Sequence, residues 1–243
     1  YVVSRADEQL ADLLGARVSS IDGQDPVAAE TLLEPIVNRD NAHQLQDLLP
    51  RLMVVPEVLH ARGVSQSPDQ VRWQFIDQSG QSRSVILRPV AVGITPNWKS
   101  LPTVDWPAGF ADRKAASLWF ADIADPDAVY LRVAEIADMP GQSFAAFAEA
   151  VETHLATTGR RRLLVDLRGN PGGDNSLNAA LVRALIATPW IREPGALFVL
   201  IDGGTFSAAM NLAEDLEHWL PAVFVGTGTG ARRPTGGGRP RGG

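Results

Sequence analysis

The chain has 243 residues, of which 45% are hydrophobic and 21% are charged, a composition typical of globular proteins with one large or two small domains. The formal net charge of −6 argues against a protein that binds nucleic acid with its whole surface. There is no cysteine, which excludes a disulfide framework and thiol chemistry, and no apolar run approaches the length of a membrane span.

The first clear pattern is a strand that runs into an Asp-Gly turn within residues 11–24. A return segment after Asp22 and Gly23 would complete a hairpin. The sequence Ile21-Asp22-Gly23 resembles the middle of a PDZ domain, where a strand runs into Ile-Asn-Gly or Ile-Asp-Gly. The resemblance implies that Ile21 and Gly23 help to bind an extended peptide by strand addition. The alternative is a plain hairpin with a structural role.

Helices are expected next, over residues 28–37, 42–49 and 52–60, the last of them broken near Pro56. This helical insertion is large for a compact PDZ domain. His43 lies within it, and a lone histidine beside apolar residues is more often structural than catalytic.

A β-hairpin is predicted over residues 70–92, because apolar and polar residues alternate along its first half. The following residues, 93–114, contain three prolines and two tryptophans and are predicted to be a linker. Residues 1–92 therefore form a PDZ-like, partly helical region. The remaining residues, 115–243, form the core, whose C-terminal end is expected to be incomplete.

The core is predicted to be an α/β structure. Residues 118–123 and 128–133 are two strands, and apolar residues at helical spacing follow over 144–155. Strands and helices then alternate as far as a last strand at 223–225. Such alternation predicts a parallel βαβ series.

The strand that begins at Leu163 ends in the sequence Asp-Leu-Arg-Gly-Asn-Pro-Gly-Gly at residues 166–173. Asp166 and Arg168 can pair and hold this loop. The glycines at 172 and 173 allow backbone N–H groups to approach a substrate closely. A helix is predicted to follow over residues 177–188.

A second strand, residues 197–201, ends in Asp-Gly-Gly, and Thr205 can cap the helix that follows. Ser207 would then lie in the first turn of that helix, where N–H groups favour negative charge. A nucleophilic serine requires such a place, although an ordinary serine in a first helical turn gives the same pattern. Because both strands are parallel, the two loops should lie side by side at one edge of the sheet.

The loop at 166–173, followed by Gly-Gly-Thr-Phe-Ser-Ala-Ala at 203–209, resembles the C-terminal processing (tail-specific) serine protease family, in particular its bacterial extracytoplasmic members. The resemblance covers residues 115–230 well and the first 90 more faintly. It implies a crotonase/Clp-like βαβ superhelical core. It also implies that Ser207 is the nucleophile and that an N–H of Gly172 or Gly173, with that of Ala208, forms the oxyanion hole. Thr205 is predicted to contact substrate.

The general base is not identified by this resemblance. In the family it is a lysine, and matching Val-Gly at 225–226 puts Arg232 at or near that position. Arginine keeps its proton and is a poor base. Three possibilities stay open: a histidine or carboxylate from elsewhere, as in the tricorn-like branch; a base outside this sequence; or a peptide-binding relative with weak or no catalysis. Asp174 and Asp202 lie near the loops and could orient a base.

The predicted function is that of a serine endopeptidase that cleaves extended or C-terminal segments of proteins. The alternative is a catalytically weak or inactive relative that acts as a peptide-binding scaffold. A crotonase-like acyl-thioester enzyme shares the oxyanion chemistry, but the PDZ-like segment and the serine argue against it. No metal or organic cofactor is implied, and the expected partners are protein or peptide substrates. The resemblance implies a periplasmic or secreted protein, and the first residue, Tyr1, suggests a processed or trimmed start.

Overall fold

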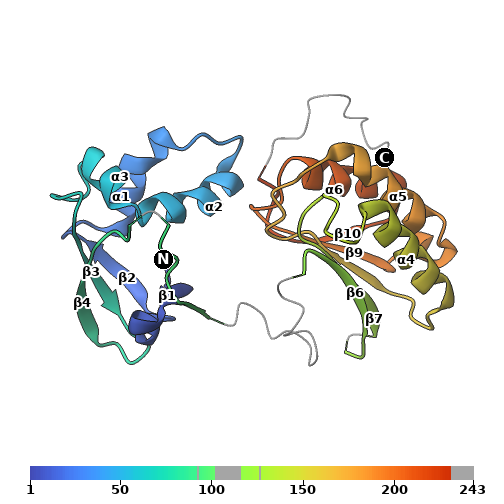
Figure 1. The fold of residues 1–243 in the computed structure, drawn as a ribbon, viewed down its shortest axis with the longest axis horizontal. Coiled ribbons are helices and arrows are strands. Elements are labelled where there is room, and N and C mark those ends of the chain that lie inside the picture. The colour runs from blue at the N-terminus through green and yellow to red at the C-terminus, as the bar shows by residue number, and fades with distance from the viewer. Residues whose placement is uncertain (92, 102–115, 126, 231–243) are drawn as a thin grey trace, which may run out of the picture. The chain divides into compact units, whose positions relative to one another are not determined.

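The computed structural model describes residues 1–91, 93–101, 116–125 and 127–230 (Figure 1). The chain divides into two compact units. The first consists of Tyr1–Asn38 and Leu48–Asp105, and the second of Arg39–Asp47 and Trp106–Gly243.

The first unit contains a three-stranded antiparallel sheet in the order β2 (Arg17–Ile21), β3 (Val71–Ile76) and β4 (Ser82–Leu87). The predicted hairpin at 70–92 is therefore confirmed. Side chains along β3 alternate between buried and exposed, as a strand with one face on a core requires. A separate pair, β1 (Arg5–Asp7) and β5 (Trp98–Ser100), is antiparallel.

Helices α1 (Pro26–Leu33), α2 (Ala42–Met53) and α3 (Pro56–Ala61) are close to those predicted. Two short 3₁₀ helices, Glu8–Leu13 and Glu34–Ile36, accompany them. The return strand expected after Gly23 does not form. The Asp25 side chain accepts from the Val27 N–H and starts α1 with Pro26 at its first position, so a single bridge from Ile21 to Gln24 is left.

The boundaries of the two units differ from the predicted domain boundaries in two places. The expected linker, 93–114, contains β5, and its pairing with β1 makes that segment part of the first unit. Residues Arg39–Asp47, expected in the N-terminal region, belong to the second unit. The rest of the expected linker, 102–114, lies outside the described residues.

The second unit contains a five-stranded sheet in the order β10-β9-β8-β7-β6. Its strands, in chain order, are β6 (Leu118–Ile123), β7 (Ala128–Val133), β8 (Leu163–Asp166), β9 (Leu197–Ile201) and β10 (Val223–Gly226). β6 is antiparallel to β7, and the other neighbours are parallel, as predicted. From β7 to β10 each new strand is added on the same side of the last one.

Three helices connect the parallel strands: α4 (Phe144–Thr157), α5 (Asn178–Ile186) and α6 (Ala208–Trp219). Short 3₁₀ helices lie at Asn175–Leu177 and Pro189–Arg192. Figure 1 shows all three α-helices on one side of the sheet. Right-handed crossovers between strands that advance in one direction produce this arrangement. The crotonase/Clp-like superhelix and the PDZ-like character of the first unit stay predictions.

The main core of the second unit lies between the sheet and these helices and includes Phe144, Leu181 and Leu212, all fully buried. The opposite face of the sheet has a smaller cluster around Trp119 and Tyr130. Trp219, in α6, is 60% exposed and takes no part in either cluster. No helix in the described part of the chain combines the length and apolarity needed to cross a membrane.

Candidate active site

The candidate site is built from two loops that leave neighbouring parallel strands. We call residues 167–174, after β8, the glycine loop and residues 202–207, after β9, the serine loop. Because β8 and β9 pair directly and in parallel, both loops begin at the same edge of the sheet. The predicted placement of the two loops side by side is confirmed.

Hydrogen bonds join the loops closely. The Phe206 N–H donates to the Asn170 carbonyl over 2.9 Å. Asp202 Oδ1 accepts from the Gly169 N–H at 2.8 Å and from the Gly204 N–H at 3.0 Å, so one carboxylate holds both loops. Asp202 therefore has a structural role, because its hydrogen bonds connect the two loops.

Ser207 has a strained backbone conformation, with φ 52° and ψ −125°. Among the described non-glycine residues, it shares a positive φ only with Asp22. Such a conformation costs about 1–3 kcal/mol and is common at active sites. A strained serine between a strand and a helix is the arrangement of a nucleophile elbow.

Ser207 lies one position before helix α6, which begins at Ala208, and not inside the first turn as predicted. Its side chain makes no capping hydrogen bond, and the residue is exposed. Thr205 does not cap the helix either. The positive φ of Ser207 turns the chain sharply between the serine loop and α6, and the hydroxyl is left available for chemistry.

Gly172 is packed directly against the serine. A Cβ atom placed on it would lie 2.6 Å from Ser207 Cβ and 3.0 Å from the Ala208 nitrogen, and its φ is +109°. Gly173 has φ +135° and packs as closely against the Ile136 carbonyl. Both positions require glycine, because a Cβ atom would overlap neighbouring atoms and because other residues rarely adopt such a positive φ.

The structure distinguishes between the predicted oxyanion-hole donors. The Gly172 N–H donates to Asn170 Oδ1 over 2.8 Å. The N–H groups of Gly173 and Ala208 have no acceptor among the residues that the structure describes. Gly173 and Ala208 therefore have N–H groups free to bind a developing oxyanion, whereas that of Gly172 is engaged.

Thr205 is fully buried between the loops. Its hydroxyl donates to the Leu167 carbonyl at 2.9 Å and accepts from the Asp202 N–H at 3.1 Å. Its side chain thus ties the two loops together, and its predicted contact with substrate stays a prediction. Asp174 accepts from the Ser176 N–H and hydroxyl and caps the short 3₁₀ helix after the glycine loop.

The predicted pair of Asp166 and Arg168 is confirmed. Asp166 is 1% exposed and accepts from Arg168 Nε at 2.9 Å and Nη2 at 2.7 Å. Tyr130 donates its hydroxyl to the same carboxylate. Burial raises the pKa of Asp166, but the hydrogen bonds from Arg168 and Tyr130, together with nearby positive charge, outweigh burial, so the pKa lies below its ordinary value.

Arg232, predicted to stand near the lysine position, lies outside the described residues. The segment before it packs on the serine loop, because the Gly230 N–H donates to the Thr205 carbonyl at 3.0 Å. His43 lies against the same segment. A Cβ on Gly228 would be 2.5 Å from His43 Nε2, and a Cβ on Gly203 would be 2.5 Å from the His43 carbonyl oxygen.

The other three histidines have different surroundings. His60 contacts the Ser65 carbonyl, His154 pairs with Asp122, and the His218 ring lies against Trp219. His43 is therefore the histidine that the described structure places on the serine loop and on the segment after β10. The sequence alone favours a structural role for His43, because no local pattern links it to glycines about 160 to 185 positions away.

The two residues of the first unit that are predicted to bind peptide have different surroundings. Ile21 is fully buried, and its N–H donates to the Gln24 carbonyl, so its side chain belongs to the core. Gly23 is exposed and lines a hollow of about 480 Å³ together with Arg72 and Ile86. Peptide binding there stays a prediction.

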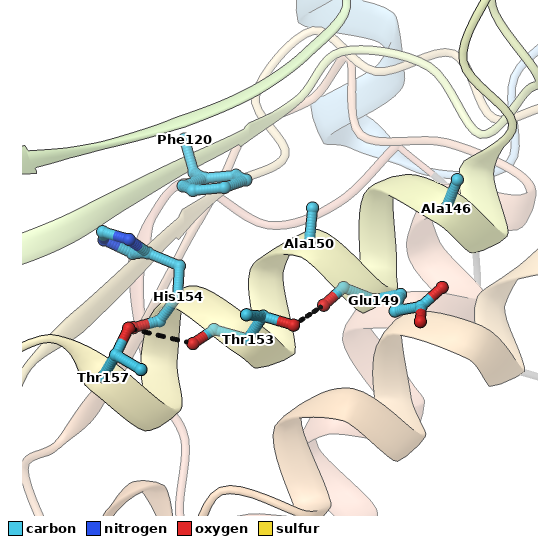
Figure 2. A pocket seen from close by; sticks show the side chains of 7 residues that line it. All are labelled: Phe120, Ala146, Glu149, Ala150, Thr153, His154 and Thr157. Carbon is cyan, nitrogen blue, oxygen red and sulfur yellow. Dashed lines mark hydrogen bonds between the residues drawn. The ribbon is translucent and has the colours of Figure 1, made fainter.

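Another hollow, of about 510 Å³, lies along helix α4 and strand β6. Figure 2 shows Phe120 and His154 facing each other at one end of it. None of its lining residues belongs to the glycine loop or the serine loop. Among the described residues, no group of three or more histidine or carboxylate side chains could hold a metal ion.

Searches by sequence find no matching family model and no matching curated protein. Solved structures do match. Mature CPAF in complex with lactacystin has a TM-score of 0.55 and 13% identity, covering 89% of this chain and 64% of that one. Mature CPAF without the compound has a TM-score of 0.53 and 13% identity, covering 89% of this chain and 63% of that one. The photosystem II D1 C-terminal processing protease has a TM-score of 0.37 and 18% identity, covering 89% of this chain and 52% of that one.

The fold of this chain is therefore similar to that of CPAF, at low sequence identity. The chain spans less than two thirds of the length of each of these structures.

Proposed function

We propose that this protein is a serine endopeptidase that cleaves extended or C-terminal segments of proteins, with Ser207 as its nucleophile. The observation that carries the proposal is the exposed, strained Ser207, packed against Gly172 at the start of a helix. We infer protein or peptide substrates from the resemblance of the two loops to those of the tail-specific protease family. A periplasmic or secreted location stays a prediction.

In the proposed reaction, Ser207 Oγ attacks the carbonyl carbon of the scissile peptide bond. The negative charge that develops on the carbonyl oxygen is stabilised by the N–H groups of Gly173 and Ala208. Ala208 is the first residue of α6, so the positive end of the helix dipole adds to this stabilisation. The leaving amine takes up a proton, and water then releases the acyl group from the serine.

His43 is the general base in this proposal. A neutral imidazole takes the Ser207 proton and returns it to the leaving amine. Two contacts support the assignment. The His43 ring packs against Gly228, and the backbone carbonyl oxygen of His43 packs against Gly203. His43 is exposed, so its ring has access to solvent and to substrate.

Labelling with a fluorophosphonate probe tests the nucleophile. We expect the wild type to be labelled on one serine, and Ser207→Ala to lose the label completely. Ser176→Ala removes another exposed serine, just beyond the glycine loop, and should be labelled like the wild type. A label that persists in Ser207→Ala would overturn the assignment. A folded wild type that takes no label would favour the peptide-binding alternative.

The general base is tested with His43→Ala. Because a general base contributes about 100-fold or more, the labelling rate of Ser207 should fall by about that factor. His154→Ala, which alters a histidine paired with Asp122, is the control and should leave the rate unchanged. An unchanged rate in His43→Ala would remove His43 from the mechanism and leave Ser207 in place.

A further inference from the structure

The glycine loop is supported along its length by the chain at the end of β7. Four hydrogen bonds of 2.7 to 2.9 Å connect the two segments: Arg132 Nη1 to the Arg168 carbonyl, Asn170 Nδ2 to the Val133 carbonyl, the Ile136 N–H to the Gly172 carbonyl, and the Asp174 N–H to the Ile136 carbonyl. The position of the loop therefore depends on residues more than thirty positions earlier.

Among these contacts, the bond from Arg132 uses a charged side chain that is itself held in place. Arg132 pairs in register with Asp166 across β7 and β8. Its Nη1 lies 3.3 Å from Asp166 Oδ1 and 3.2 Å from the Asp166 carbonyl, and it donates to the Arg168 carbonyl at 2.7 Å. The Arg132 side chain is 19% exposed and that of Asp166 is 2% exposed.

Asp166 is fixed from several directions at once. Arg168 donates two side-chain hydrogen bonds and its own N–H to the carboxylate. Tyr130 donates its hydroxyl, and it lies two residues before Arg132, so both side chains project from the same face of β7. The carboxylate thus provides a rigid negative charge that orients the Arg132 guanidinium.

We propose that Arg132, oriented by Asp166, is a positioning residue for the oxyanion hole. By holding the Arg168 carbonyl, Arg132 fixes the start of the glycine loop and, through it, the Gly173 N–H. The inference rests on the proposed function. Arg132 touches no substrate in this scheme, so its removal should weaken stabilisation of the transition state and not binding of the ground state.

Steady-state kinetics on a peptide substrate separate these effects. For Arg132→Met we expect kcat to fall by about 10- to 100-fold, because small displacements of a catalytic group have effects of that size, with KM changed by no more than about twofold. For Arg132→Lys we expect a smaller loss, of about three- to tenfold. An ammonium can reach the Arg168 carbonyl, but it lacks the rigid planar group that holds Nη1 of Arg132 against both this carbonyl and Asp166 Oδ1.

Arg160→Met is the matched control. Arg160 forms ion pairs with Asp127 and Asp122, and it precedes β8, at the opposite end of that strand from the glycine loop. Its kcat should equal that of the wild type. Circular dichroism checks that each variant is folded. If Arg132→Met does not fold, Tyr130→Phe, which removes one hydrogen bond to Asp166, should still lower kcat at constant KM.

The outcomes separate this inference from the proposed function. A wild type without fluorophosphonate labelling overturns both. A labelled and active wild type with unchanged kcat in folded Arg132→Met overturns the positioning role alone. A parallel rise in KM without loss of kcat also overturns it, because it would assign Arg132 to substrate binding. A fall in kcat that Lys partly restores supports the inference.

Discussion

At the scale of single residues, the candidate site depends on two glycines at positions where there is no room for a side chain. Gly172 lies where any side chain would meet Ser207, and Gly173 lies where any side chain would meet Ile136. The Ser207 backbone is held in a conformation that few non-glycine residues adopt. Close packing therefore fixes where the hydroxyl and the two available N–H groups lie.

Gly172→Ala should abolish the reactivity of Ser207. Its Cβ would lie 2.6 Å from Ser207 Cβ, so either the serine or the glycine loop must move, and we expect at least a 100-fold fall in fluorophosphonate labelling. Gly195→Ala is the control, because its φ is also positive at +80° but its Cβ would meet nothing within 4 Å. Equal labelling of both variants would contradict this account.

At the scale of elements, the ends of β7 and β8 are joined by a buried charge cluster. Asp166 at the end of β8 accepts from Tyr130 of β7, and its register partner on β7 is Arg132. A buried carboxylate is tolerated because its partners satisfy it, and the same partners hold its pKa below the ordinary value. The cluster therefore links the stability of the sheet to the position of the glycine loop.

Asp166→Asn should lower stability in a pH-dependent way. Because the folded pKa of Asp166 is depressed, its contribution is present above the unfolded pKa of about 4 and is lost as pH falls through the folded pKa. We expect the variant to be less stable by about 3–5 kcal/mol at pH 7, with the difference shrinking toward pH 3. Urea unfolding at several pH values measures this.

The matched control for the buried carboxylate is Asp127→Asn. Asp127 forms an exposed ion pair with Arg160, and such pairs contribute about 0–1 kcal/mol. A stability loss in Asp166→Asn that is independent of pH would show that the residue acts through its shape and not through its charge.

At the scale of the whole molecule, the second unit is assembled from distant parts of the chain. Arg39–Asp47 belongs to it although β6, its first strand, begins about 70 residues later. Asn41 Nδ2 donates to the Thr229 carbonyl at 2.9 Å, and the His43 ring lies on Gly228. The segment after β10 thus joins His43 to the serine loop.

Gly228→Val should displace His43 and slow the reaction. A Cβ there would overlap the imidazole ring, so we expect kcat/KM to fall about tenfold or more, with little change in the unfolding midpoint. Gly159→Val, at a glycine whose Cβ would meet nothing within 4 Å, is the control. A variant with the same kcat/KM and the same pH profile as the wild type would exclude His43 as the base.

Much of the second unit was predictable from the sequence alone. Continuous apolar runs define β8 and β9, helical spacing defines α4 and α6, and the glycines and prolines at the ends of β8 and β9 mark the loops. These signals are local, because strand and helix periodicity and turn chemistry act over a few residues. The pairing of Asp166 with Arg168 was predictable for the same reason.

Other features were decided only by the tertiary structure, since each depends on residues far apart in the chain. The sequence shows the glycines at 172 and 173 but cannot tell which N–H group is engaged, because that follows from the Asn170 side chain in the folded loop. The support of the glycine loop by Arg132 depends on the register of β7 and β8. The approach of His43 to Gly228 depends on long-range packing that no local pattern encodes.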